Sequence, residues 1–330
     1  MKNFSYVRAT SVKEAVQQAA TSPSAMFIAG GTNLVDRMKV FLDEPSQLID
    51  ITRLGMTRIE QTNGDLRIGA LVSNTAVADH PEIRRNYPML SRAILLGASQ
   101  QIRNMATVGG NLLQRTRCPY YYDTAFACNK RAPGSGCAAL TGINRIHALF
   151  GASDQCVAVH PSDMCVPLAA LNAIVEVEGP KGNRQIPFGN FHRLPGDTPH
   201  RDSNLEPGEL ITAVILPPAP FAKSSVYLKL RDRASYAFAL VSVAAAVEIA
   251  DNRIKQARLA MGGVAHMPWR FTEAETFLID KAATTETFQR AAEIALQGAE
   301  PLKHNGFKVE LAKRAIRRAL AVSAKGGGVA

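Results

Sequence analysis

Cysteine is concentrated in one short part of this chain. Its five cysteines, Cys118, Cys128, Cys137, Cys156 and Cys165, lie between positions 118 and 165, and no other part of the 330 residues contains one. A small odd number of cysteines disfavours a disulfide scaffold. Thiolates are ligands for zinc and for iron–sulfur clusters. The clustering therefore indicates a bound inorganic group.

The first four cysteines have a spacing of their own, Cys118-x9-Cys128-x8-Cys137-x18-Cys156. Four thiolates suit a 4Fe-4S cluster or a tetrahedral Zn²⁺ ion, although the CxxC pairs usual in structural zinc sites are missing. A loop with free thiols is the third alternative. We expect Cys165 to be a free, buried cysteine on a helix. None of the seven histidines has metal-ligand spacing, and we expect a structural role for His160.

Two glycine pairs lie where a backbone could bind an anion. Ala29–Leu34, AGGTNL, follows an apolar segment and precedes a helical one, and Thr107–Asn111, TVGGN, repeats the paired glycines beside a hydroxyl and an amide. Glycine lets a ligand approach the backbone closely, and a helix N-terminus attracts negative charge. Neither segment is a Walker A or a GxGxxG motif. Together, two such loops could hold the two phosphates of one dinucleotide.

The surrounding pattern predicts an α+β protein. A βαβ-type unit begins the chain, with a helix capped by Ser11, and a hairpin turns at Asn63-Gly64. Residues 112–160 have little periodicity and form an irregular insert, and loops of this length are usually functional. We place a domain boundary at residue 222, with subdomains 1–55 and 56–222 before it. Residues 223–330 should form a sheet backed by helices. Strands are expected at 25–29, 47–51, 58–60, 66–71, 173–178, 210–216, 225–231, 239–249 and 253–262, and helices at 11–20, 34–41, 73–80, 88–98, 161–171, 272–280, 285–298 and 307–324.

Composition excludes several protein classes. Hydrophobic residues make up 46% and charged residues 20% of the chain, which excludes collagen-like and largely disordered proteins. The longest uncharged apolar run, 236–247, is too short to cross a bilayer, and the first ten residues do not resemble a signal peptide. The net charge is +10, but the basic residues are scattered. Solvated surfaces explain them best, partner docking second and nucleic-acid binding last.

The motifs in combination resemble a known family. The order AGGTNL, QIRNxATxGGN and Ser162-Asp163, followed by YLKLRDRASYAFALVSVAAA, is similar to the FAD-binding subunit of the molybdenum hydroxylases, the family of xanthine dehydrogenase and aldehyde oxidoreductase. The resemblance implies a two-subdomain FAD-binding fold of the PCMH type, as in vanillyl-alcohol oxidase-like flavoproteins. It also implies a C-terminal domain like that of the CO dehydrogenase flavoprotein.

The resemblance carries specific residues with it. It implies that the first glycine loop wraps the pyrophosphate of FAD and that the second continues the contact. Asp163 would bind ribityl or phosphate-side polar groups, Ile211 would lie near the ring, and Lys229 would stabilise the reduced flavin. For Asp163 the alternative is a helix N-cap, and for Lys229 a solvated strand lysine. The implied FAD-binding residues are Phe27, Ile28, Ala29, Gly30, Gly31, Thr32, Asn33, Leu34, Thr107, Gly110, Asn111, Asp163, Ile211 and Lys229.

The insert is similar to the cluster-bearing loop in the flavin subunit of bacterial periplasmic-type aldehyde oxidoreductases, through RTRCPYYYDT and HPSDM. This favours a 4Fe-4S cluster on Cys118, Cys128, Cys137 and Cys156. The implied function is electron transfer through FAD to a soluble acceptor while aldehydes are oxidised to carboxylic acids. The implied partners are a large molybdenum-cofactor subunit and a small 2Fe-2S subunit, in a heterotrimer. Hydroxylation would occur on the large subunit, so no catalytic residue for it is expected here.

Two other functions compete with this one. The first is a stand-alone flavin reductase or oxidase of the same FAD-binding fold, which leaves the insert unexplained. The second is a zinc-stapled, non-enzymatic assembly protein. We expect a cytoplasmic chain if it acts alone, and a periplasmic complex if a partner carries the export signal.

Overall fold

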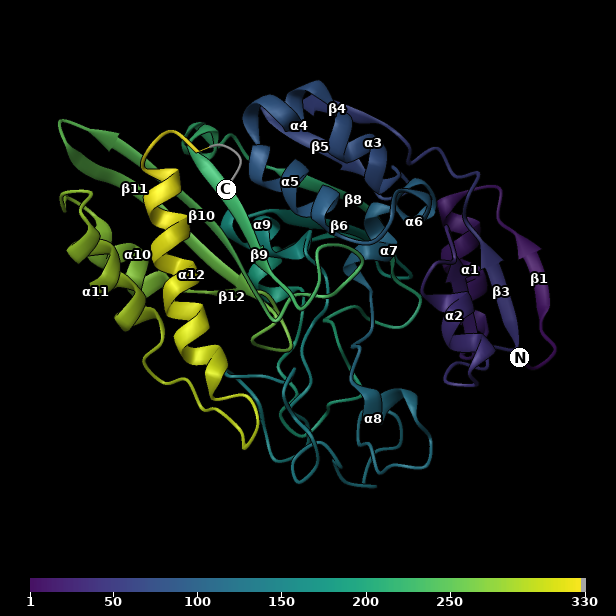
Figure 1. Ribbon diagram of the computed structural model, residues 1–330. Coiled ribbons are helices and arrows are strands. Elements are labelled where there is room, and N and C mark those ends of the chain that lie inside the picture. Colours follow the sequence, from purple (N-terminus) through teal and green to yellow (C-terminus); the bar gives the residue numbers. More distant parts are fainter. Residues whose placement is uncertain (328–330) are drawn as a thin grey trace.

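The computed structural model describes residues 1–327, which form three sheets with helices packed against them (Figure 1). The N-terminal unit, a five-stranded unit and a C-terminal unit lie above an irregular segment, which is at the bottom of the view. Among the described residues, none of the helices combines the length and the apolar character needed to span a membrane.

The N-terminal unit is a parallel sheet of order β1-β3-β2, with the first glycine loop at the end of β2. Helix α1 begins where the sequence predicts, because the Ser11 side chain accepts a hydrogen bond from the Glu14 amide. The sequence patterns predict no strand at the position of β1. The elements are β1 (Ser5–Arg8), α1 (Val12–Thr21), β2 (Ala25–Ile28), α2 (Leu34–Lys39) and β3 (Gln47–Asp50).

The second unit is a five-stranded antiparallel sheet, β4-β5-β8-β6-β7, covered by short helices. The predicted hairpin turn is present: Asn63 and Gly64 have positive φ of 53° and 90°. Its strands are β4 (Ile59–Thr62), β5 (Asp65–Gly69), β6 (Ile174–Gly179), β7 (Gly182–Pro187) and β8 (Leu210–Leu216). Its helices are α3 (Asn74–Asp79), α4 (Pro81–Asn86), α5 (Pro88–Leu96), α6 (Gln100–Met105), α7 (Val108–Leu112), α9 (Cys165–Ala170) and the 3-10 helices η1 (Phe188–Asn190) and η2 (Pro220–Lys223).

The C-terminal unit is an antiparallel sheet, β12-β11-β10-β9, with helices on one face. Its central strand is buried on both faces: Val243 and Ala245 face the core of this unit, whereas Ala244 and Ala246 face the core of the second unit. The sheet therefore packs against the cores of both units. The elements are β9 (Ser225–Leu230), β10 (Val241–Ala250), β11 (Arg253–Gly262), β12 (Trp269–Arg270), α10 (Thr272–Leu278), α11 (Thr285–Ala295) and α12 (Phe307–Ser323).

The cysteine-bearing segment between α7 and α9 is irregular, as expected, apart from the one-turn helix α8 (Pro119–Tyr122). Its own small core contains three of the thiols and Tyr121. Lys308, at the start of α12, is fully buried and donates hydrogen bonds to the carbonyls of His147 (2.8 Å) and Gly263 (2.6 Å). The segment is thus attached to the C-terminal unit.

Candidate functional site

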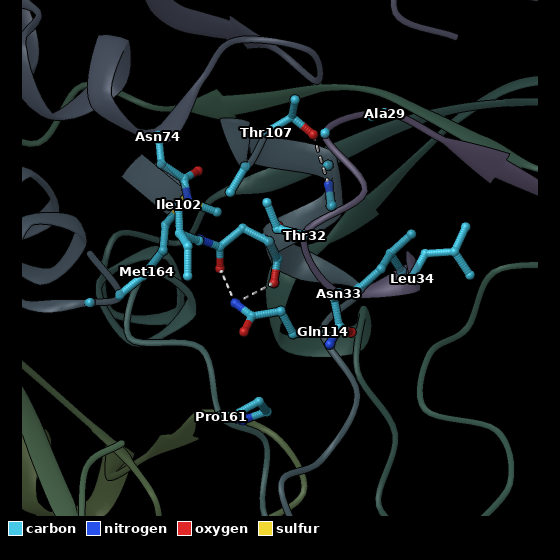
Figure 2. Close-up of a pocket in the computed structure, with 18 of the residues that line it drawn as sticks. Ala29, Thr32, Asn33, Leu34, Asn74, Ile102, Thr107, Gln114, Pro161 and Met164 are labelled. Atoms are coloured by element: carbon cyan, nitrogen blue, oxygen red, sulfur yellow. Dashed lines mark hydrogen bonds between the residues drawn. The ribbon is translucent and has the colours of Figure 1, made fainter. Parts of the chain in front are cut away.

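One cavity of about 700 Å³ lies where the three units meet. A volume of this size is typical of a cofactor site. The sequence-predicted FAD-binding residues all line it, although they come from five different parts of the chain. Figure 2 shows that side chains of both glycine loops surround the same space, with Thr32 and Asn33 on one side and Asn74 and Ile102 on another.

The first glycine loop packs directly on the end of α6, just before the second glycine loop. A Cβ added to Gly30 would lie 1.8 Å from the carbonyl oxygen of Met105, so no other residue fits there without moving the backbone. Gly31 has a φ of +70°, the left-handed conformation that favours glycine. Glycine is therefore needed at the two positions for different reasons. Gly30 permits close contact with the Met105 backbone, and Gly31 allows the turn into α2.

The second glycine loop forms the first turn of α7. Thr107 caps this helix, and its hydroxyl accepts a hydrogen bond from the Gly110 amide. The Asn111 side chain accepts from the Ser162 hydroxyl (2.5 Å) and from the Gln114 amide (2.9 Å), so it is held in one orientation. The sequence motif was expected to be a loop, and the structure shows a short helix instead.

Asp163 and Lys229 form a buried ion pair at the cavity wall. Lys229 Nζ lies 2.7 Å from Asp163 Oδ2, with side chains 1% and 9% exposed. Lys229 also donates to the Leu96 carbonyl (3.1 Å), and the Tyr227 hydroxyl donates to Asp163 Oδ1 (2.6 Å). Asp163 is therefore no N-cap: Met164 holds that position of α9. Lys229 is no solvated lysine either.

The cavity carries an excess of positive charge that the motifs alone did not indicate. Six cationic side chains line it against three carboxylates, those of Asp36, Asp163 and Glu209. The cationic residues are Arg37, Arg103, Arg115, Arg117, Lys229 and Arg233. Four of them lie in the segments 115–117 and 229–233, and the sequence alone does not show that these segments face one cavity.

Several donors along the cavity have no partner in the described structure. Asn33 Nδ2, Arg103 Nε and Arg117 Nε are buried without a hydrogen bond. A buried unpaired donor is costly, so each calls for a bound acceptor. Pyrophosphate is an anion rich in acceptor oxygens. The donors, the net charge and the glycine loops therefore fit FAD.

The four insert thiols gather in one place. Cys118, Cys128 and Cys156 are buried in a common cluster, Cys137 packs against it, and Cys128 pairs with Cys137 in an antiparallel bridge. Cys156 donates a hydrogen bond to Cys137, which lowers the pKa of Cys137 and raises that of Cys156. Burial raises the pKa of Cys118 to about 11.

Two histidines contact this thiol cluster from outside the motif. His147 Nε2 lies 3.1 Å from Cys118 Sγ, and His266 Nε2 lies 3.3 Å from Cys156 Sγ. Burial lowers their pKa values to about 4 and about 3, so both rings are neutral at pH 7. The Nδ1 atoms of both have no partner in the described structure. The Nε2–H tautomer of each ring would therefore donate to sulfur.

The spacing of the sulfur atoms bears on what they could hold. Histidine, cysteine, aspartate and glutamate side chains can each offer one ligand atom to a metal. Within residues 1–327, the only group of three or more whose ligand atoms all lie within 4.8 Å of one another is outside this thiol cluster. In a tetrahedral zinc site, sulfur atoms lie about 3.8 Å apart. An iron–sulfur cluster is larger than a single ion and holds its thiolates farther apart. The four thiols thus do not form one tight group, although Cys137 and Cys156 lie close enough to share a hydrogen bond.

A charged link joins the cavity to the thiol cluster. Arg115, which lines the cavity, and Lys130, two residues after Cys128, both form ion pairs with Asp202. Burial alone would raise the pKa of Asp202, but the charges of Arg115 and Lys130 lower it below its ordinary value. Residues 113–115 and 117 line the cavity, and Cys118 follows them directly in the chain.

The chain matches two family models along most of its length. Residues 2–219 match the FAD binding domain in molybdopterin dehydrogenase, and residues 226–322 match the CO dehydrogenase flavoprotein C-terminal domain.

Named relatives extend over nearly the whole chain. It is 51% identical to the aldehyde oxidoreductase FAD-binding subunit PaoB of Escherichia coli, over 97% of this chain and 98% of that protein. It is 28% identical to the glyceraldehyde dehydrogenase medium chain of Sulfolobus acidocaldarius, over 92% and 91%. Among solved structures, quinoline 2-oxidoreductase from Pseudomonas putida 86 matches with a TM-score of 0.77, at 27% identity over 99% of both chains.

Proposed function

This chain belongs to the FAD-binding subunits of the molybdenum hydroxylase family, and on that basis we propose that it is the FAD- and 4Fe-4S-containing electron-transfer subunit of a molybdenum-dependent aldehyde oxidoreductase. The observation that carries the proposal is the junction at Arg117 and Cys118. Arg117 lines the cavity, and the next residue is the first thiol of the cluster. Two cofactor sites that share consecutive residues would suit a relay.

FAD would supply chemistry that no side chain has, exchanging electrons singly with clusters and in pairs with an acceptor. The chain's own residues would bind and orient it. Gly30, Gly31, Thr107 and Gly110 would line the pyrophosphate site beside the α7 N-terminus. The other implied residues, Phe27, Ile28, Ala29, Thr32, Asn33, Leu34 and Asn111, complete this wall.

At the opposite wall, the residues expected near the ring have restricted positions. Lys229 is locked by Asp163 and the Leu96 carbonyl, so its charge is fixed in place rather than free to move. Ile211, 3% exposed, presents an apolar side chain to the same cavity. A fixed cation there would favour negative charge on a bound ring.

Cys118, Cys128, Cys137 and Cys156 would ligate the 4Fe-4S cluster. Hydrogen bonds to the sulfur atoms are one of the ways in which proteins set a cluster's potential. His147 and His266 would donate such bonds, and Lys130 would place a buried positive charge nearby. The cationic surroundings offset the negative charge of four thiolates.

The remaining parts of the reaction belong to other subunits. We propose a heterotrimer with a large molybdenum-cofactor subunit, where aldehydes are oxidised to carboxylic acids, and a small 2Fe-2S subunit. The name of the 51% identical relative, an aldehyde oxidoreductase subunit, supports this substrate class. A soluble acceptor would take electrons from the flavin. The complex would be periplasmic if a partner carries an export signal.

The test is anaerobic reduction of the purified complex by an aldehyde. Added aldehyde should bleach the flavin absorbance of the complex, whereas the same aldehyde should leave the flavin of the isolated chain oxidised. Bleaching in the isolated chain would instead mean that this chain oxidises the substrate itself, as a stand-alone flavin enzyme would. A flavin that stays oxidised in an active complex would contradict the relay.

A further inference from the structure

Three potential metal ligands meet behind the cavity wall, outside the thiol cluster. They are His160, in the segment before α9, Cys165, the first residue of α9, and His192, which follows η1. One ligand atom from each lies within 4.8 Å of the others. The two imidazole rings are 4.2 Å apart between centroids. No sequence spacing indicates this group, because a separate segment supplies His192.

The nitrogen atoms of this group are buried and unpaired. His160 is 9% exposed, and neither of its ring nitrogens has a hydrogen-bond partner in the described structure. His192 is 5% exposed, with Nε2 2.9 Å from the Leu112 carbonyl and Nδ1 without a partner. Nε2 must be the donor to that carbonyl, so Nδ1 carries a free lone pair. A ligating histidine usually has this arrangement, with its second nitrogen bonded to a carbonyl.

The third member adds a thiol that has no other assigned role. Cys165 is 0% exposed, and it is the cysteine that the four-thiol cluster leaves over. Two neutral imidazoles and one thiolate form a borderline-soft ligand set of the kind that zinc prefers. His160 and His192 also line a second cavity of about 180 Å³, which leaves room for a water molecule as fourth ligand.

We propose that His160, Cys165 and His192 form a second metal site, which binds a zinc-class ion. The site would release the proton of the Cys165 thiol on binding, as thiolate ligands require. It would attach the His160–Cys165 segment to the segment after η1. Because that first segment contains Ser162 and Asp163, the ion would stiffen the wall of the large cavity. This proposal does not depend on the flavin or iron assignments.

The test is elemental analysis and zinc X-ray absorption of the full chain, purified with its iron content intact so that the four-thiol cluster is filled. We expect about one zinc per chain, with about two nitrogen neighbours at 2.0–2.1 Å and one sulfur at 2.3 Å. A shell of four sulfur atoms would place the zinc on the other cysteines and overturn the proposal. So would the absence of zinc after incubation with excess Zn²⁺, since water would then fill the cavity.

Two variants give an independent check. Cys165→Ala should lose zinc and keep iron, whereas Cys128→Ser should lose iron and keep the zinc bound by two nitrogens and one sulfur. His200→Ala is the matched histidine control, because His200 lines the same small cavity but lies outside the group of three. Zinc retained by Cys165→Ala, or lost by His200→Ala alone, would contradict the assignment. If Cys165→Ala does not fold, the absorption spectrum of the unaltered chain still decides.

Discussion

Single residues decide how closely the two glycine loops approach each other. Gly30 contacts the backbone of Met105, so its hydrogen atom occupies space that a methyl group cannot. The ion pair of Asp163 and Lys229 fixes the opposite wall through atoms that are almost entirely buried. Both features restrict the shape of the cavity before any ligand binds, which is how a preformed cofactor site reduces the cost of binding.

The first prediction concerns Gly30→Ala. The added methyl group must displace the Met105 backbone, at a cost of about 1–3 kcal/mol, and FAD binding should weaken about tenfold or more. FAD released on denaturation, counted per chain, is the measurement. Gly55→Ala is the control, since a Cβ at Gly55 meets nothing within 4 Å. Equal flavin content in the two variants would show that contact between the loops is unimportant.

The second prediction compares two lysines of one sheet. Lys229→Met leaves Asp163 buried without its partner and should destabilise the chain by about 3–5 kcal/mol. Lys255→Met breaks an exposed pair with Asp280, whose side chains are 41% and 68% exposed, and should cost about 1 kcal/mol or less. Urea unfolding of both variants measures the difference. Similar losses would contradict the structural role of the buried pair.

At the level of elements, the irregular segment is held by its neighbours rather than by secondary structure. Lys308 and Asn305, at the start of α12, both bond to the carbonyl of His147, whose ring contacts Cys118. The C-terminal unit therefore positions one side of the thiol cluster. Lys308, in the first turn of α12, therefore has a structural role, because its side chain is buried and bonds to backbone carbonyls.

The third prediction follows from the burial of Lys308, which lowers its pKa to about 7. In the unfolded chain a lysine pKa is about 10.4. Between these values the unfolded chain binds more protons, so this residue's contribution to stability rises with pH, by roughly 1 kcal/mol per unit. The unfolding free energy of the wild type minus that of Lys308→Met should therefore grow from pH 7 to pH 9. A difference that stays constant would contradict the shift.

Elements with strong local signals could be predicted from sequence, and others could not. Ser11 and Ser73 mark the helices that they cap, and Asn63-Gly64 marks its hairpin. The helix at Val108 was missed because its two glycines oppose helix formation locally, and tertiary contacts with Ala70 stabilise it. The predicted helix at 161–171 begins only at Cys165, whose backbone amide donates a hydrogen bond to the Ser162 hydroxyl.

On the scale of the whole molecule, the two candidate sites are adjacent because three units converge. The motifs identified the residues of the large cavity, since each lies in a recognisable segment. They could not identify the meeting of His160 with His192, because that depends on how distant segments pack. Contacts between distant segments thus depend on the fold, whereas the glycine loops can be recognised in the sequence.

The central claim, that one chain holds both a flavin and a four-iron cluster, is tested most directly by counting cofactors on the full chain purified anaerobically. We predict one FAD with about four iron and four sulfide per chain, the numbers that one such cluster requires. Cys128→Ser should lose the iron and keep the FAD, and Cys165→Ser should keep both. A chain that binds FAD without iron, or that keeps its iron in Cys128→Ser, would contradict the account.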